Sequence, residues 1–166
     1  NAKLFDLHIT DDGAAEIANR SRGTPRVAGR LLRRVRDFSV VQENMPIDDN
    51  FADMALNRLE VDSCGLDSMD HQYLLYIINN FDGGPVGIET ISAALSEERD
   101  TIEAVVEPFL MQKGFLQRTS RGRMVTSGGY NHLGIEPPIP DQGDILERHR
   151  LATNESDNVS DEDELG

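Results

Sequence analysis

Residues 100–126 read DTIEAVVEPFLMQKGFLQRTSRGRMVT, and this stretch decides the fold of the second half of the chain. Asp100 and Glu103 have the spacing of a capping box, so the sequence predicts a helix over residues 101–112. Pro108 lacks a backbone N–H and should kink that helix or make it irregular.

A β-hairpin is predicted directly after this helix. Residues 115–119 and 123–126 have the composition of short strands. They flank Ser120-Arg121-Gly122, and a short connection that contains glycine is typical of a hairpin. The helix and the hairpin together suggest a recognition helix followed by a wing.

The preceding residues complete the same pattern. Asp67 and Asp70 have capping-box spacing and open a predicted helix that Gly83-Gly84-Pro85 ends. Val86-Gly87 is expected to form a very short strand, and residues 88–95 a further helix. Helix, short strand, helix, turn, helix and hairpin is the order of a winged helix-turn-helix, which we assign to residues 62–137.

Three helices are predicted in residues 1–61. Thr10 is expected to cap the first helix, which continues to a break near Gly23. Thr24-Pro25 opens the second, which runs to about Phe38 with its arginines opposite its apolar side chains. Asp49 is expected to cap the third, and the three helices should form one small bundle.

The charge is unevenly distributed. The formal net charge is −14, which is unusual for a chain that binds nucleic acid. Residues 136–166 hold ten acids against two arginines, whereas residues 20–36 hold seven arginines and no acid. We therefore expect residues 138–166 to form an acidic, disordered tail, and the positive charge to act at a few arginine sites.

Several classes of protein are excluded. No apolar run approaches the ~20 residues that cross a bilayer, so no membrane association is expected. A single cysteine, Cys64, excludes an intrachain disulfide framework and fits a cytoplasmic protein. No G-x-x-x-x-G-K-[ST] segment is present, so the chain alone is expected to bind no ATP and to contain no catalytic residue. No metal site is expected either, because the histidines are scattered without metal-ligand spacing: His8, His71, His132 and His149.

Long segments resemble the RuvB family of AAA+ ATPases, which drive branch migration of Holliday junctions. The segment Arg22-Gly-Thr-Pro-Arg26 and residues 30–38 resemble the small lid domain of that family. Three further segments resemble the winged-helix domain of the family: residues 83–87, 97–103 and 114–124. The resemblance covers roughly residues 4–137.

This resemblance implies a mainly α fold, with a small AAA+ helical lid bundle followed by a winged helix-turn-helix domain with a β-hairpin wing. It implies that the chain is the C-terminal two-thirds of an ATP-dependent DNA helicase or translocase that uses ATP and Mg²⁺. The full-length protein would form homohexamers on double-stranded DNA and Holliday junctions and work with RuvA and RuvC in recombination and repair. The fragment alone would be inactive.

Five arginines are the candidate site residues. The resemblance places Arg26 on the nucleotide phosphates as the sensor-2 arginine, although an arginine on the polar face of a helix is usually only solvated. Double-stranded DNA is the expected partner of the other four arginines. Arg99 lies in the turn before the recognition helix, and the hairpin carries the other three: Arg118, Arg121 and Arg123. Acidic side chains crowd the recognition helix, so contact with phosphates is favoured over deep entry into the major groove.

Two other functions stay open. A stand-alone winged-helix regulator would read a DNA site, but the sequence lacks the more basic recognition helix that this function favours. A winged helix can also bind another protein, which the acidic helices would permit. The hairpin arginines would then be solvated charges.

Overall fold

The computed structural model describes residues 8–43 and 45–138. Contacts within the chain define two units, residues 1–134 and residues 135–166. The acidic tail predicted for residues 138–166 therefore lies, apart from Pro138, outside the described residues. All the elements below belong to the first unit.

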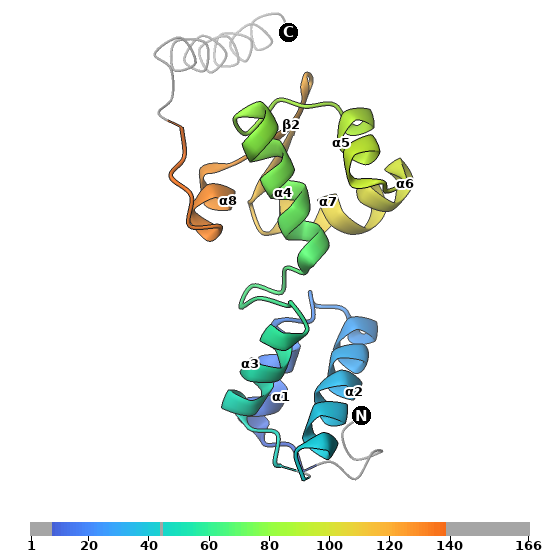
Figure 1. The fold of residues 1–166 in the computed structure, drawn as a ribbon, viewed down its shortest axis with the longest axis vertical. Coiled ribbons are helices and arrows are strands. Elements are labelled where there is room, and N and C mark those ends of the chain that lie inside the picture. Colours follow the sequence, from blue (N-terminus) through green and yellow to red (C-terminus); the bar gives the residue numbers. More distant parts are fainter. Residues whose placement is uncertain (1–7, 44, 139–166) are drawn as a thin grey trace, which may run out of the picture. The chain divides into compact units, whose positions relative to one another are not determined.

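Residues 8–61 form the expected helical bundle from α1 (Asp11–Asn19), α2 (Pro25–Val41) and α3 (Asp49–Arg58), drawn in blue to blue-green in Figure 1. Thr10 caps α1 as predicted, since its hydroxyl accepts the N–H of Gly13 at 3.1 Å. The cap of α3 was predicted one residue too late. Asp48, whose backbone is extended, accepts the N–H of Phe51 at 2.8 Å, and Asp49 is the first residue of the helix.

The bundle has an aliphatic core to which α2 contributes Leu31 and Val35. The four arginines predicted for the polar face of α2 are exposed: Arg26, Arg30, Arg33 and Arg34. The remaining core side chains come from α1, the connection before α3, and α3 itself: Ile17, Ile47, Phe51, Ala52, Ala55, Leu56 and Val61.

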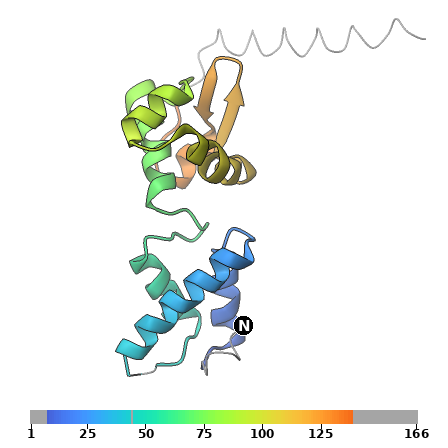
Figure 2. The ribbon, with the colours of Figure 1, turned by 90° about the vertical axis from the view of Figure 1, so that its right-hand side faces the viewer.

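Residues 62–134 contain the predicted order of a winged helix. The elements are α4 (Ser68–Phe81), α5 (Ile88–Leu95), α6 (Arg99–Thr101), η2 (Ile102–Val106), α7 (Glu107–Gln112), β1 (Leu116–Thr119), β2 (Gly122–Val125) and α8 (Ser127–His132). Figure 2 shows β1 and β2 side by side as an antiparallel pair. The short strand predicted at Val86-Gly87 is a single β-bridge between Val86 and Arg123. The mainly helical fold with a hairpin is confirmed.

The recognition helix is continuous over α6, η2 and α7, but its start differs from the prediction. It begins at Arg99 after Glu98, with no side-chain cap, so the predicted capping box of Asp100 and Glu103 is absent. Glu103 instead binds arginines of the neighbouring elements. The irregularity expected from Pro108 is a π-helical turn, η2, which lies just before the position where the proline N–H is missing.

Helix α8 was not predicted, because Gly128 and Gly129 have poor helix propensity. Thr126 caps it by accepting the N–H of Gly129 at 3.2 Å. A Cβ at Gly129 would lie 2.6 Å from the carbonyl oxygen of Phe115. The glycine therefore permits close packing of α8 against the start of the hairpin.

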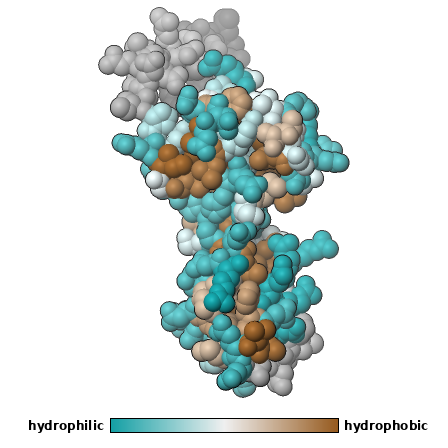
Figure 3. All heavy atoms as spheres, viewed as in Figure 1, coloured by the Kyte–Doolittle hydropathy of each residue, from teal (hydrophilic) through white to brown (hydrophobic). Residues whose placement is uncertain are grey.

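The surface is mostly hydrophilic on the face drawn in Figure 3, with separate apolar areas between the polar side chains. The exposed large apolar side chains are Val40, Val41, Met45, Val105 and Met111. None of the described helices is long and apolar enough to cross a membrane.

Candidate nucleic-acid interface

The hairpin presents Arg121 at its turn. Thr119 lies opposite Gly122 in the register, and its hydroxyl donates to the Gly122 carbonyl at 2.9 Å. The same hydroxyl accepts the N–H of Arg121 at 3.3 Å. Arg121 is exposed, and its guanidinium has no hydrogen bond or ion pair with any residue that the structure describes. It is therefore available to an external anion.

Arg118 and Arg123 lie directly opposite each other on the hairpin, so their side chains share one face of it. On that face, both arginines form ion pairs with two glutamates of the recognition helix. Arg123 donates from Nε to Glu107 Oε1 and from Nη2 to Glu103 Oε1, both at 2.7 Å. Arg118 Nη2 donates to Glu103 Oε1 at 2.6 Å and to Glu107 Oε2 at 3.1 Å.

These two arginines differ in burial. Arg123 is 9% exposed and Glu107 is 1% exposed, whereas 49% of the Arg118 side chain is exposed. Burial by itself would lower the pKa of Arg123, but the hydrogen bonds to Glu107 raise it, so the guanidinium stays charged. A DNA contact by Arg123 stays a prediction. The burial of this side chain does not favour such a contact. The position of Arg118 is compatible with one.

Tyr73 completes the buried part of this network. Its hydroxyl donates to Glu107 Oε1 at 2.8 Å, and the side chain is fully buried. Burial and the charge of Glu107 raise the pKa of Tyr73, so the hydroxyl stays protonated and continues to donate. Glu107 thus joins α4 and β2 to the recognition helix.

Arg99 lies in the first turn of the recognition helix and is exposed. It donates to Glu89 Oε1 of α5 at 3.0 Å and to Glu103 Oε2 at 3.2 Å. Glu103 is therefore shared by Arg99, Arg118 and Arg123. Because the Arg99 pairs are solvent-exposed, an incoming phosphate can replace the carboxylates at small cost.

Arg26 is the second residue of α2 in the bundle. It is exposed, and no described residue accepts a hydrogen bond from its side chain or forms an ion pair with it. Thr24, which precedes the helix, makes no side-chain cap, so the first N–H groups of α2 lack that partner. A free guanidinium beside a helix N-terminus suits an anionic ligand.

Sequence reasoning missed Glu107 as the buried partner of the hairpin. A signal was present, because Glu103 and Glu107 are four residues apart on one helix and border its apolar arc. Buried acids need positive partners, and the hairpin that follows the helix supplies three arginines.

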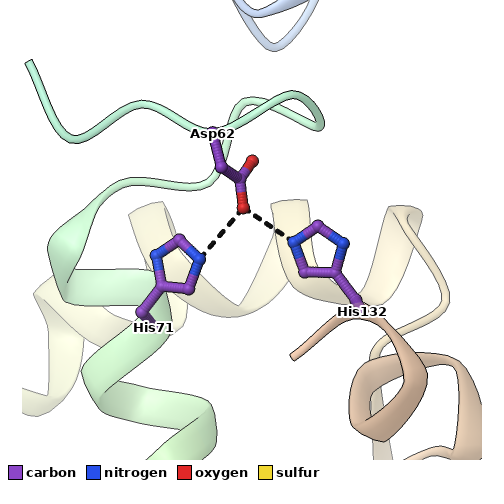
Figure 4. Close-up of side chains that lie close together, drawn as sticks. All are labelled: Asp62, His71 and His132. Carbon is purple, nitrogen blue, oxygen red and sulfur yellow. Dashed lines mark hydrogen bonds and ion pairs between the residues drawn. The ribbon is translucent and has the colours of Figure 1, made fainter. Parts of the chain in front are cut away.

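Sequence reasoning also missed a cluster of Asp62, His71 and His132, shown in Figure 4. The expectation that the histidines lie scattered is wrong for these two, whose ring centres are 6.2 Å apart. Burial alone would raise the pKa of Asp62, but the hydrogen bonds with His132 and with the N–H of Leu66 lower it. No spacing signal could have revealed the cluster, because the fold brings its members together from distant positions.

Comparison with known proteins matches both halves of the chain. Residues 1–62 match the RuvB AAA lid domain, and residues 63–134 match the RuvB C-terminal winged helix domain. The chain is 62% identical over 137 residues to the Holliday junction branch migration complex subunit RuvB of Paramagnetospirillum magneticum, covering 82% of this chain and 40% of that protein.

Solved structures give the same result. The Thermotoga maritima RuvB Holliday junction branch migration motor aligns with a TM-score of 0.79 at 46% identity. The alignment covers 82% of this chain and 46% of that one, and a point variant of that motor aligns equally well. The chain thus spans less than half the length of these relatives, rather than the two-thirds expected from the sequence. It belongs to the RuvB family, through its AAA lid domain and its C-terminal winged-helix domain.

Proposed function

We propose that the chain is the part of an ATP-driven Holliday-junction branch-migration motor that senses nucleotide and contacts DNA. Residues 1–61 act as the lid and residues 62–137 as the DNA-contacting domain. The full-length protein is an ATP-dependent DNA translocase that uses Mg²⁺, assembles as a homohexamer, and works in the cytoplasm with RuvA and RuvC. The chain alone hydrolyses no ATP.

One observation carries the DNA-binding part of this proposal. Arg121 is exposed at the hairpin turn and forms no ion pair with a carboxylate of the described residues, although acids outnumber basic residues in the chain. Arg118 and Arg99 extend the contact by exchanging their exposed glutamate partners for phosphates. Arg123 contributes by holding the hairpin against Glu107. Contacts of this kind read no sequence, as a translocase requires.

DNA binding by point variants tests the proposal. Arg121→Ala should weaken binding to unrelated duplexes about equally and reduce the slope of log affinity against log salt by roughly one unit. Arg58→Ala is the matched control, because it removes one exposed positive charge from the end of α3. Equal affinities for the parent and Arg121→Ala, measured over the same salt series, would show that the hairpin is not the contact.

Arg26 carries the nucleotide-sensing part. In the full-length protein, Arg26→Ala should reduce ATP turnover strongly, because a guanidinium that stabilises developing phosphate charge is lost. The fold should survive, since Arg26 is exposed. Arg30→Ala, one helical turn further along the same polar face, is the control. Normal turnover by a folded Arg26→Ala hexamer would refute the sensor role.

A further inference from the structure

The cluster of Asp62, His71 and His132 brings three metal-ligating groups together from separate elements (Figure 4). Asp62 lies in the connection before α4, His71 in α4 and His132 at the end of α8. His71 Nε2 is 3.0 Å from Asp62 Oδ2, and His132 Nε2 is 2.7 Å from the same oxygen. One atom of each ligand lies within 4.8 Å of the others.

The carboxylate of Asp62 is fixed by the backbone of its own loop. Its Oδ1 accepts the N–H groups of Cys64 and Leu66, both at 2.9 Å. These bonds leave Oδ2 directed at the two imidazole rings. Hydrogen bonds that orient a ligating carboxylate in this way are typical of built metal sites.

His71 is oriented by a hydrogen bond at its other ring nitrogen. Its Nδ1 is 2.8 Å from the backbone carbonyl oxygen of Asp67, which can only accept, so Nδ1 carries the hydrogen. Nε2, which lies 3.0 Å from Asp62 Oδ2, is then the nitrogen of His71 that is available to a metal ion.

His132 is held in place by stacking. Its ring lies 4.7 Å from the ring of Phe115, with an interplanar angle of 20°. The stacking fixes the plane in which Nε2 points at Asp62. All three donors are therefore positioned by groups outside the cluster.

We propose that Asp62, His71 and His132 form a binding site for a divalent transition-metal ion, with Zn²⁺ as the best fit. Two imidazole nitrogens and one carboxylate oxygen are a common set of zinc ligands, whereas Ca²⁺ and Mg²⁺ prefer oxygen. Bonds of about 2.0–2.1 Å in a tetrahedron separate neighbouring ligand atoms by about 3.3 Å. Asp62 Oδ2 would have to move away from each imidazole nitrogen by a few tenths of an ångström from the observed 3.0 and 2.7 Å, and the two nitrogens, which lie within 4.8 Å of each other, would have to adopt the same spacing.

The fourth coordination position has access to solvent. A surface cavity of about 380 Å³ is lined by Asp62, His71 and Gln72 among other residues. His71 and His132 are 31% and 15% exposed, so an ion can enter without unfolding the domain. A water molecule would complete the coordination. The ion would tie the connection before α4 to α4 and α8.

Metal titration of the untagged, chelator-treated 166-residue chain tests this site. Calorimetry with Zn²⁺ should show one tight equivalent, and Co²⁺ should give the strong visible absorption of a four-coordinate ion. His71→Gln and His132→Gln should each weaken the tight binding of Zn²⁺ by about tenfold to a hundredfold. His8→Gln is the matched control, because it removes an exposed histidine outside the cluster and should leave binding unchanged.

Stability measurements separate loss of the site from loss of the fold. Zn²⁺ should raise the Tm of the parent and of His8→Gln, but not that of His71→Gln, whose circular dichroism should match the parent. Weak binding to the acidic residues 139–166 would be common to all variants and so would not affect the comparison. If the parent binds no stoichiometric Zn²⁺, or if both histidine variants bind as tightly as the parent, the proposal is wrong.

Discussion

Replacing Glu107 with alanine should destabilise the winged-helix domain more than any change to the exposed acids of the recognition helix. Glu107 is 1% exposed and accepts hydrogen bonds from Tyr73, Arg118 and Arg123. Alanine removes all of these acceptors at once. It leaves a buried hydroxyl and a nearly buried guanidinium facing a cavity that the side chain had filled.

The size of the effect follows from the groups left behind. Removing one partner of a buried ion pair typically costs about 3–5 kcal/mol, and the lower end applies because Arg123 keeps Glu103 at 2.7 Å. The orphaned Tyr73 hydroxyl adds about 1–3 kcal/mol. We therefore expect Glu107→Ala to lower the free energy of unfolding by about 4–6 kcal/mol, a large share of the stability of an ordinary domain. Glu107→Gln, which keeps an acceptor oxygen, should lose less.

Urea unfolding followed by circular dichroism would measure these differences. Glu103→Ala is the matched control, because Glu103 binds the same arginines but is 26% exposed and solvated. Its loss should be clearly smaller. A double variant, Glu107→Leu with Arg123→Met, should recover much of the stability, since replacing both members of a buried pair is often neutral. If Glu107→Ala is no less stable than Glu103→Ala, the buried network does not hold the hairpin.

Three further predictions concern backbone geometry, pH and the acidic tail. Gly122→Ala should lower the free energy of unfolding by at least about 2–3 kcal/mol, because φ is +137° and the new Cβ would lie 2.4 Å from the Val86 carbonyl oxygen. Gly29→Ala is the control: it has open space in α2 and should instead stabilise the fold by about 0.5–1 kcal/mol in the same urea assay. Burial raises the pKa of Asp70 to about 6 from 3.8, so its contribution to stability is present below pH 3.8 and is lost as pH rises through 6. Relative to Asp70→Asn, the unfolding free energy of the parent should fall by up to about 3 kcal/mol between pH 4 and pH 7, and parallel pH profiles would contradict this. Deleting residues 141–166 should raise DNA affinity at low salt, with a gain that shrinks as salt increases, because nine acids that compete with phosphate are removed; an unchanged affinity in a filter-binding series would refute that competition.

The sequence allowed most of the fold to be predicted because its local signals agree with the tertiary structure. Thr10, Pro25 and the pair Asp67–Asp70 each begin a helix as their chemistry predicts. Glycine-rich α8 and the cap of the recognition helix were not predictable in this way. Both depend on packing, since α8 is held by the close approach of Gly129 to Phe115.

Only part of the candidate site could be predicted from the sequence, for a similar reason. Spacing and charge located Arg118, Arg121 and Arg123 on one hairpin, and strand alternation places the first and last on one face. Which of them is buried depends on what lies against that face. That information comes from Glu107 and Tyr73, whose burial is set by the packing of the whole domain.

The acidic composition and a DNA-contacting role are compatible once the charges are paired. Three arginines near the recognition helix and hairpin pair with three glutamates, Glu89, Glu103 and Glu107, whereas Arg121 has no such partner among the described residues. Each phosphate contact contributes about 0.9 to the salt slope. A slope near one therefore means that Arg121 acts alone. A slope near three means that Arg99 and Arg118 have released their glutamates to phosphate. Glu103 would then be left with Arg123 alone, so the recognition helix would keep its hold on the hairpin while the DNA is exchanged.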